Sequence, residues 1–182
     1  MKLRRLLAIA FMLGLFISLV ILLSSFFSRE PPYRRIILNA IELRNVGNNS
    51  VAKARLVSEL DSLVQQTKHT EVKTHWQRLT ECMAECSDDT YFDLVVASAI
   101  EGQETVPNAK LVGDLVVTNR FWGANDVVEF SRALASADEA IGQMRSKMFD
   151  RQWGAVIACD GKCEEKNDLF FDLIRVVVSQ EV

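Results

Sequence analysis

Proline and glycine are scarce in this sequence, which has 3 Pro and 8 Gly among its 182 residues. Folds built from many short strands need frequent turn residues, and alternating patterns bounded by hairpin turns are also missing here. Most apolar residues instead recur at the three- and four-residue intervals of amphipathic helices. The sequence therefore predicts an all-α fold.

Basic residues are not in excess, because 21 Lys and Arg face 24 Asp and Glu, for a formal net charge of −3. The first 27 residues hold three of the bases, so residues 28–182 carry 18 bases against 24 acids. A general nucleic-acid binder needs a basic surface. The composition therefore argues against nucleic acid as a partner.

Catalytic signatures are missing as well, since the sequence has no phosphate-binding P-loop, no GxGxxG and no Gly-x-Ser-x-Gly. The two histidines, His69 and His75, are six residues apart and do not share a helical face. Asp88 and Asp89 stand at an expected helix start, where the helix dipole favours acids. The sequence thus favours a protein without catalytic activity and predicts no cofactor.

One long apolar run stands at the N-terminus, where residues 6–27 are 22 in number and carry no charge. As a helix rising about 1.5 Å per residue, this run would span the roughly 30 Å core of a bilayer. A cleaved signal peptide is the alternative, but the run is longer than usual and no clear cleavage site follows it. We therefore expect residues 1–27 to anchor the protein in the cell membrane as a single-pass transmembrane helix.

The orientation of this anchor depends on the bases at its two ends. Lys2, Arg4 and Arg5 precede the run in a tight cluster, whereas Arg29 and the arginines at 34–35 follow it with Glu30 among them. Because basic residues are retained on the cytoplasmic side, the tighter cluster favours a cytoplasmic N-terminus. We expect the following domain on the extracytoplasmic side.

Residues 28–35 are predicted to form a stiff, extended linker around Pro31 and Pro32, and residues 36–182 to form one helical domain. Gly47 ends the first helix, and Asn49 or Ser50 can cap the second. No internal repeat is evident. Short joints between helices predict an up-and-down bundle. The predicted helices cover residues 36–46, 51–67, 72–85, 91–100, 108–122, 127–148 and 168–179.

The clearest helical pattern begins at residue 127 and alternates intervals of three and four residues. This spacing predicts a continuous helix that lies along one partner with a straight, coiled-coil-like seam. The pattern extends toward residue 157. Its apolar members up to residue 148 are Val127, Phe130, Leu134, Ala137, Ile141, Met144 and Met148.

The four cysteines form two CxxxC pairs, Cys82 with Cys86 and Cys159 with Cys163. One interpretation is structural disulfides, either local or between the two segments. A second is a metal site with four thiolate ligands. A third is free thiols, some of them in the core. All three are compatible with the spacing.

Residues 111–135 resemble a helix–corner–helix segment of uncharacterised bacterial single-pass membrane proteins with helical domains. The resemblance implies a bacterial origin and an antiparallel helix pair, and it brings no catalytic residues. The matching residues are Phe121, Gly123, Ala124, Asp126 and Val127.

Phe121 and Trp122 stand together at this corner. If they are exposed, they form a candidate partner surface, and if they are buried they close one end of the bundle. The leading hypothesis is therefore a membrane-anchored, non-catalytic helical interaction module that binds a protein partner or forms a homo-oligomer. The alternative is a metal- or redox-responsive membrane protein that uses the two CxxxC pairs.

Overall fold

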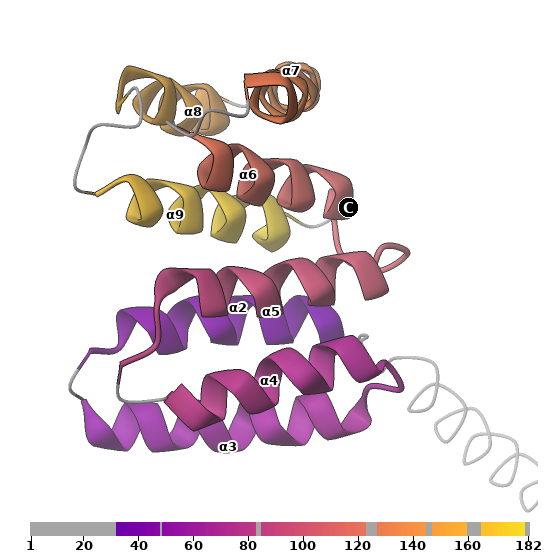
Figure 1. Cartoon of the computed structure of the whole chain (residues 1–182), viewed down its shortest axis with the longest axis vertical. Coiled ribbons are helices and arrows are strands. Elements are labelled where there is room, and N and C mark those ends of the chain that lie inside the picture. The colour runs from indigo at the N-terminus through magenta and orange to yellow at the C-terminus, as the bar shows by residue number, and fades with distance from the viewer. Residues whose placement is uncertain are drawn as a thin grey trace, which may run out of the picture. The chain divides into compact units, whose positions relative to one another are not determined.

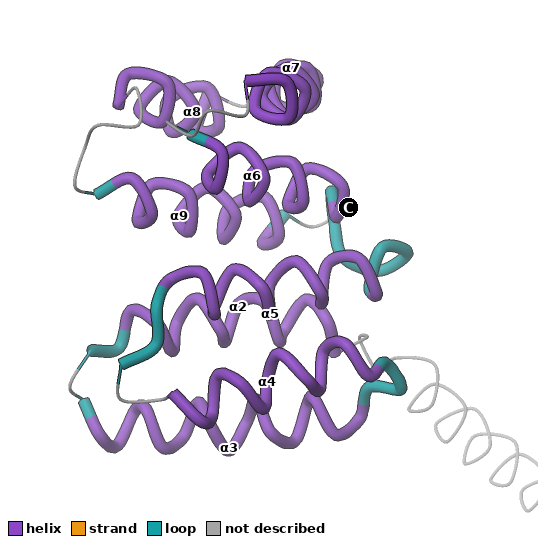
Figure 2. The backbone as a smooth tube through the Cα atoms, in the orientation of Figure 1, coloured by secondary structure: helices purple, strands orange, loops and turns teal. Residues whose placement is uncertain are grey.

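The computed structural model describes residues 32–47, 49–82, 85–122, 127–144, 147–159 and 165–180. By its contacts the chain divides into Met1–Pro31 and Pro32–Val182, and all described residues belong to the second unit. Regular structure in these residues is entirely helical, which confirms the all-α prediction (Figure 2). The helices are α2 (Pro32–Asn45), α3 (Ser50–Gln66), α4 (Thr70–Cys82), α5 (Asp88–Glu101), α6 (Ala109–Phe121), α7 (Val127–Gln143), α8 (Lys147–Cys159) and α9 (Lys166–Ser179).

The helices form a bundle of stacked pairs (Figure 1). Two inner pairs, α2 with α5 and α6 with α9, meet through contacts of α5 with α6 and of α2 with α9. The pair α3 and α4 covers one side of this centre, and the pair α7 and α8 covers the other. The first and last described helices are therefore neighbours, although they are far apart in the sequence.

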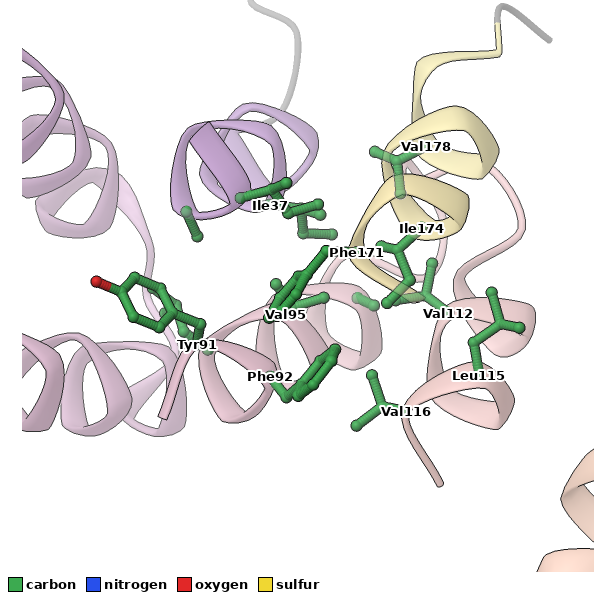
Figure 3. Close-up of a cluster of buried hydrophobic side chains, with 14 of the residues drawn as sticks. Ile37, Tyr91, Phe92, Val95, Val112, Leu115, Val116, Phe171, Ile174 and Val178 are labelled. Carbon is green, nitrogen blue, oxygen red and sulfur yellow. The ribbon is translucent and has the colours of Figure 1, made fainter. Parts of the chain in front are cut away.

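The core is centred where the inner pairs meet. The rings of Phe92 on α5 and Phe171 on α9 stack with centroids 4.0 Å apart and an interplanar angle of 2°. Val95, Val112 and Ile174 surround them, and all five side chains are buried (Figure 3). Burying one such apolar side chain contributes about 1.5–3 kcal/mol. This centre holds the two inner pairs together.

The joint between α2 and α3 follows the prediction. Gly47 adopts a left-handed conformation with φ of 57°, which glycine allows at little cost after a helix. Asn49 then caps α3, because its Oδ1 accepts a hydrogen bond of 3.2 Å from the backbone N–H of Ala52. The predicted cap at Asn49 is therefore confirmed.

Helix α2 begins at Pro32, so the prediction of an extended linker is wrong for residues 32–35. Proline suits the first helical turn, where its missing N–H has no partner to lose. Arg34 adds a second reason, since its guanidinium donates 2.9 Å hydrogen bonds to the carbonyl oxygens of Val178 and Ser179. The start of α2 is thereby tied to the end of α9. Residues 28–31 lie outside the described part of the chain.

The prediction of one continuous helix from residue 127 is also wrong, because α7 ends at Gln143, Met144 lies in a turn and α8 begins at Lys147. Helix α8 returns along α7, and the Trp153 Nε1–H donates a 2.9 Å hydrogen bond to Asp138 Oδ1. An apolar pattern that stays in phase across a turn cannot distinguish one long helix from a helical hairpin. The predicted seam also begins late, since the Val127 side chain is 67% exposed.

None of the described helices is both long enough and apolar enough to cross a membrane. The predicted transmembrane span, residues 6–27, lies outside the residues that the structure describes.

Candidate functional site

Cys82, the last residue of α4, forms a disulfide with Cys86, and their Cα atoms are 5.0 Å apart. Both residues are half-buried. Their sulfurs lie 3.5 and 3.3 Å from the carbonyl oxygen of Leu79. The disulfide therefore fixes the joint at which the chain leaves α4 and approaches α5.

Cys159, the last residue of α8, is also disulfide-bonded, and Cys163 lies outside the described residues. The pairing of Cys82 with Cys86 is local, so these two do not join α4 to α8. Within the described ranges, no three His, Cys, Asp or Glu side chains are grouped closely enough to hold a metal ion. Zinc binds thiolates, so a metal site at Cys82 and Cys86 requires the reduced protein.

Phe121 and Trp122 are both half-buried at the end of α6. The Trp122 ring meets the rings of Phe130 and Phe170 edge-on, with centroids 5.2 and 6.0 Å apart. Trp122 therefore packs onto the core while keeping one part exposed. Val127 and Val128 at the start of α7 are each 67% exposed. Residues 123–126, which include three of the residues that carry the bacterial resemblance, are not described.

Four polar side chains, one from each inner helix, meet beside the core, and we call them the central polar network. They are Arg44 of α2, Asp88 of α5, Asn119 of α6 and Asn167 of α9. Arg44 binds both carboxylate oxygens of Asp88, through Nε at 2.8 Å and Nη2 at 3.1 Å. Asn167 Nδ2 donates to Asp88 Oδ2 at 2.7 Å, and Asn119 Nδ2 donates to Asn167 Oδ1 at 3.0 Å.

The electrostatics of this network centre on Asp88. Burial works against its charge, but hydrogen bonds from Arg44 and Asn167 outweigh that effect and hold its pKa below the usual value. Burial likewise opposes the Arg44 charge, yet hydrogen bonds to Asp88 and Asp168 raise the pKa of the guanidinium. The guanidinium carbon also lies 4.8 Å from the centroid of the Phe171 ring, a cation–π contact.

The members of the network form hydrogen bonds with one another, so the network connects the four inner helices. A carboxylate with a lowered pKa stays ionised at neutral pH and is a poor proton donor there. A bidentate guanidinium–carboxylate pair is strong and has a fixed geometry. We therefore assign the network a positioning role in the packing of α2, α5, α6 and α9.

Two polar pockets flank the central polar network. In the first, Arg120 forms an ion pair with Asp93, and in the second Arg44 forms one with Asp168. The first pocket thus holds two acids and two bases, whereas the second holds two acids and one base. The first is lined by Asp89, Asp93, Asn119, Arg120, Lys166 and Asn167, and the second by Arg44, Asn45, Gly47, Asp168 and Asp172.

Sequence analysis missed the network. It explained Asp88 by the helix dipole alone, whereas the carboxylate binds Arg44, which is 44 residues away in the sequence. Asn119 offered one signal, because it falls on the same helical face as Leu115 and Val116 and is buried with them. A polar residue in phase with an apolar stripe indicates a buried hydrogen bond.

Each outer pair of helices is held by a tryptophan–aspartate hydrogen bond. Trp76 Nε1 of α4 donates to Asp61 Oδ1 of α3 at 3.2 Å. Trp153 of α8 and Asp138 of α7 form the corresponding bond, and the sequence separation is 15 in both cases. The tryptophans thus bury their rings and satisfy their single donor.

No protein-family model, curated protein or solved structure matches this chain. The resemblance of residues 111–135 to bacterial single-pass membrane proteins stays a prediction. The function therefore has to be argued from the molecule itself.

Proposed function

We propose that the protein is a membrane-anchored helical interaction module, without a catalytic role, whose helical domain lies on the extracytoplasmic side. The apolar run at residues 6–27 supplies the anchor. The observation that carries the proposal is the Cys82–Cys86 disulfide. Disulfides form and persist in oxidising compartments and are rare in the cytosol, which favours the outward orientation.

The described side chains support a scaffold for binding. The central polar network and the two tryptophan–aspartate bonds fix helices against one another, and the disulfide fixes the joint after α4. A rigid surface loses less conformational entropy on binding than a flexible one. The candidate partner surface is the half-exposed pair Phe121 and Trp122 together with Val127 and Val128, since aromatic residues dominate the binding energy of many interfaces. The partner is a protein or a second copy of the chain.

The orientation is tested by labelling thiols in intact cells with a membrane-impermeant maleimide. A full-length variant with Cys159→Ser and Cys163→Ser restricts the signal to Cys82 and Cys86. We expect labelling that needs a reductant but no lysis. Labelling that appears only after lysis, without reductant, would place the domain in the cytoplasm and contradict the proposal. A cytosolic thiol protein in the same cells controls for leakage.

The binding role is tested by pull-down of the full chain from detergent extracts, together with a measurement of self-association. We expect Val128→Ser to reduce the recovered complex, because it removes an apolar side chain that is 67% exposed in the first turn of α7. Ile157→Ser, which changes a 43% exposed residue on α8, is the matched control and should leave recovery unchanged. If no partner is recovered and the chain does not self-associate, the proposal is contradicted.

The second candidate is a metal- or redox-responsive membrane protein that uses the two CxxxC pairs. It is favoured by the position of the half-buried disulfide, which lies at the joint leading to α5 and hence to Asp88. Reduction would remove about 2 kcal/mol of loop-closure stabilisation for so short a loop. If neither oxidation nor added zinc changes the stability of the purified, reduced chain, this candidate is excluded.

A further inference from the structure

We infer that residues 32–182 are two copies of one four-helix unit, α2–α5 and α6–α9, joined in one chain and related by an approximate twofold axis. In each unit the first and fourth helices form the inner pair and the second and third form the outer pair (Figure 1). This corrects the sequence analysis, which found no internal repeat. The inference does not depend on the proposed function.

Residues that make specific contacts recur in the same order in both units, at a shift of 77 residues up to the cysteines and of 79 residues in the fourth helix. Asp61 and Trp76 are hydrogen-bonded in the first unit, and a shift of 77 positions gives the bonded pair Asp138 and Trp153. The same shift relates the first CxxxC pair to the second. In the fourth helix of each unit the tripeptide Phe-Asp-Leu recurs, at residues 92–94 and 171–173. Unrelated helices would not repeat bonded pairs and their spacing together.

The contacts between the units identify the symmetry. Near a twofold axis a residue meets its own counterpart. Phe92 stacks on Phe171, and Asp88, four residues before Phe92, binds Asn167, four residues before Phe171. The helix contacts are reciprocal as well, because α5 packs on α6 and α9 packs on α2. A repeat related by translation alone would not produce both contacts.

The two polar pockets are also counterparts. Asp89 and Asp93 line the first, and Asp168 and Asp172, at the same distances from the stacked phenylalanines, line the second. Each pocket contains an arginine from the end of its inner helix, Arg120 or Arg44. The duplication therefore extends to the surface.

Apolar exchange in the cores explains why the repeat is hidden in the sequence. Helix cores accept many apolar substitutions when volume and pattern are kept. The residues that recur are therefore those that form a hydrogen bond or a disulfide, or that meet their counterpart at the twofold axis. The repeat requires the disulfide of Cys159 to be made with Cys163, which is the cysteine that the Cys82–Cys86 bond leaves and the counterpart of Cys86.

Disulfide mapping tests this assignment on the purified full chain in detergent, equilibrated with oxidised glutathione. After free thiols are trapped with N-ethylmaleimide, trypsin cuts between the second pair at Lys162. We expect peptide 152–162 bonded to peptide 163–166, and an internal bond within peptide 79–110. A bond from peptide 79–110 to either of the others, or an open second pair beside a closed first pair, would overturn it. Because oxidation is imposed in vitro, the result is independent of the compartment in which the domain lies.

A reciprocal exchange tests the structural equivalence. Ser98 and Val177 stand six residues after Phe92 and Phe171, both are 0% exposed, and Ser98 Oγ has no hydrogen-bond partner. If the units are equivalent, the site of Ser98 accepts valine, and Ser98→Val raises the Tm by at least about 3 °C. Val177→Ser lowers the Tm. Ser98→Ala is the control, because it removes the hydroxyl without adding the two methyl groups of valine. It should raise the Tm less than Ser98→Val does. A Tm for Ser98→Val below that of the unchanged chain would contradict the equivalence.

Discussion

Asp88 stands at the start of α5, and its carboxylate binds Arg44 of α2 and Asn167 of α9. One carboxylate therefore links three helices. We expect Asp88→Asn to lower the free energy of unfolding by about 2 kcal/mol, since hydrogen bonds to a charged group are stronger than neutral ones. Chemical unfolding of the full chain in detergent measures this change. Asp89→Asn is the control at the exposed neighbour and should change the free energy by less than about 0.5 kcal/mol. Equal effects of the two substitutions would contradict the role of the network.

The pH dependence of stability provides a second prediction at this scale. The pKa of Asp88 in the folded protein lies below the ordinary value of 3.8, so its ionised form stabilises the fold. This contribution is fully present above pH 3.8 and disappears as the pH falls through the lower, folded pKa. The difference in unfolding free energy between the unchanged chain and Asp88→Asn should therefore shrink below about pH 4. A difference that grows on acidification would show that folding raises the pKa of Asp88 instead of lowering it.

At the scale of the helix, the cap of α3 depends on one side chain. Asn49→Ala removes the acceptor for the Ala52 N–H and is expected to destabilise the protein by about 1 kcal/mol. Asn49→Ser keeps an acceptor and should cost only a fraction of that. Chemical unfolding of both variants gives the comparison. Equal losses for the two variants would mean that the capping hydrogen bond contributes little.

Helix ends with a local signal could be predicted from the sequence, whereas those decided by distant contacts could not. Gly47 and Asn49 act through their own backbone and nearest neighbours, so both were predicted. The start of α2 combines a local signal, proline in the first turn, with the distant contact of Arg34 to the end of α9, and the turn after α7 lets Trp153 reach Asp138. Such contacts link residues that no local pattern relates.

At the scale of the whole domain, the stacked phenylalanines hold the two halves together. Phe92→Ala is expected to cost about 3–5 kcal/mol, because it leaves a cavity against Phe171. Hydrogen exchange should then rise in α9 as well as in α5, since both rings lie between the halves. Phe149→Ala, which changes a buried ring on the outer helix α8, is the control for a cavity away from that junction. Loss of protection confined to α5 would contradict the proposed role of the stack.

The class of the fold could be predicted because most apolar residues follow helical intervals and hairpin signals are missing, but the candidate site could not. The four members of the central polar network come from four helices, and their meeting depends on how the inner pairs stack. The cysteine spacing was visible, yet the local pairing of Cys82 with Cys86 required the structure. Long-range packing therefore decides which polar residues meet.

Asp88 and Asn167 show what a chain gains when two equal units are fused. In a dimer of identical chains, the axial aspartate would face a second aspartate, and two carboxylates at hydrogen-bonding distance repel unless a proton is shared. In the fused chain the two counterpart positions can hold different residues. The Asp88 carboxylate therefore accepts a 2.7 Å hydrogen bond from the Asn167 amide. The same covalent link removes the dependence on protein concentration, because a dimer of separate units dissociates on dilution. A protein present in a few copies per cell would keep its two halves assembled.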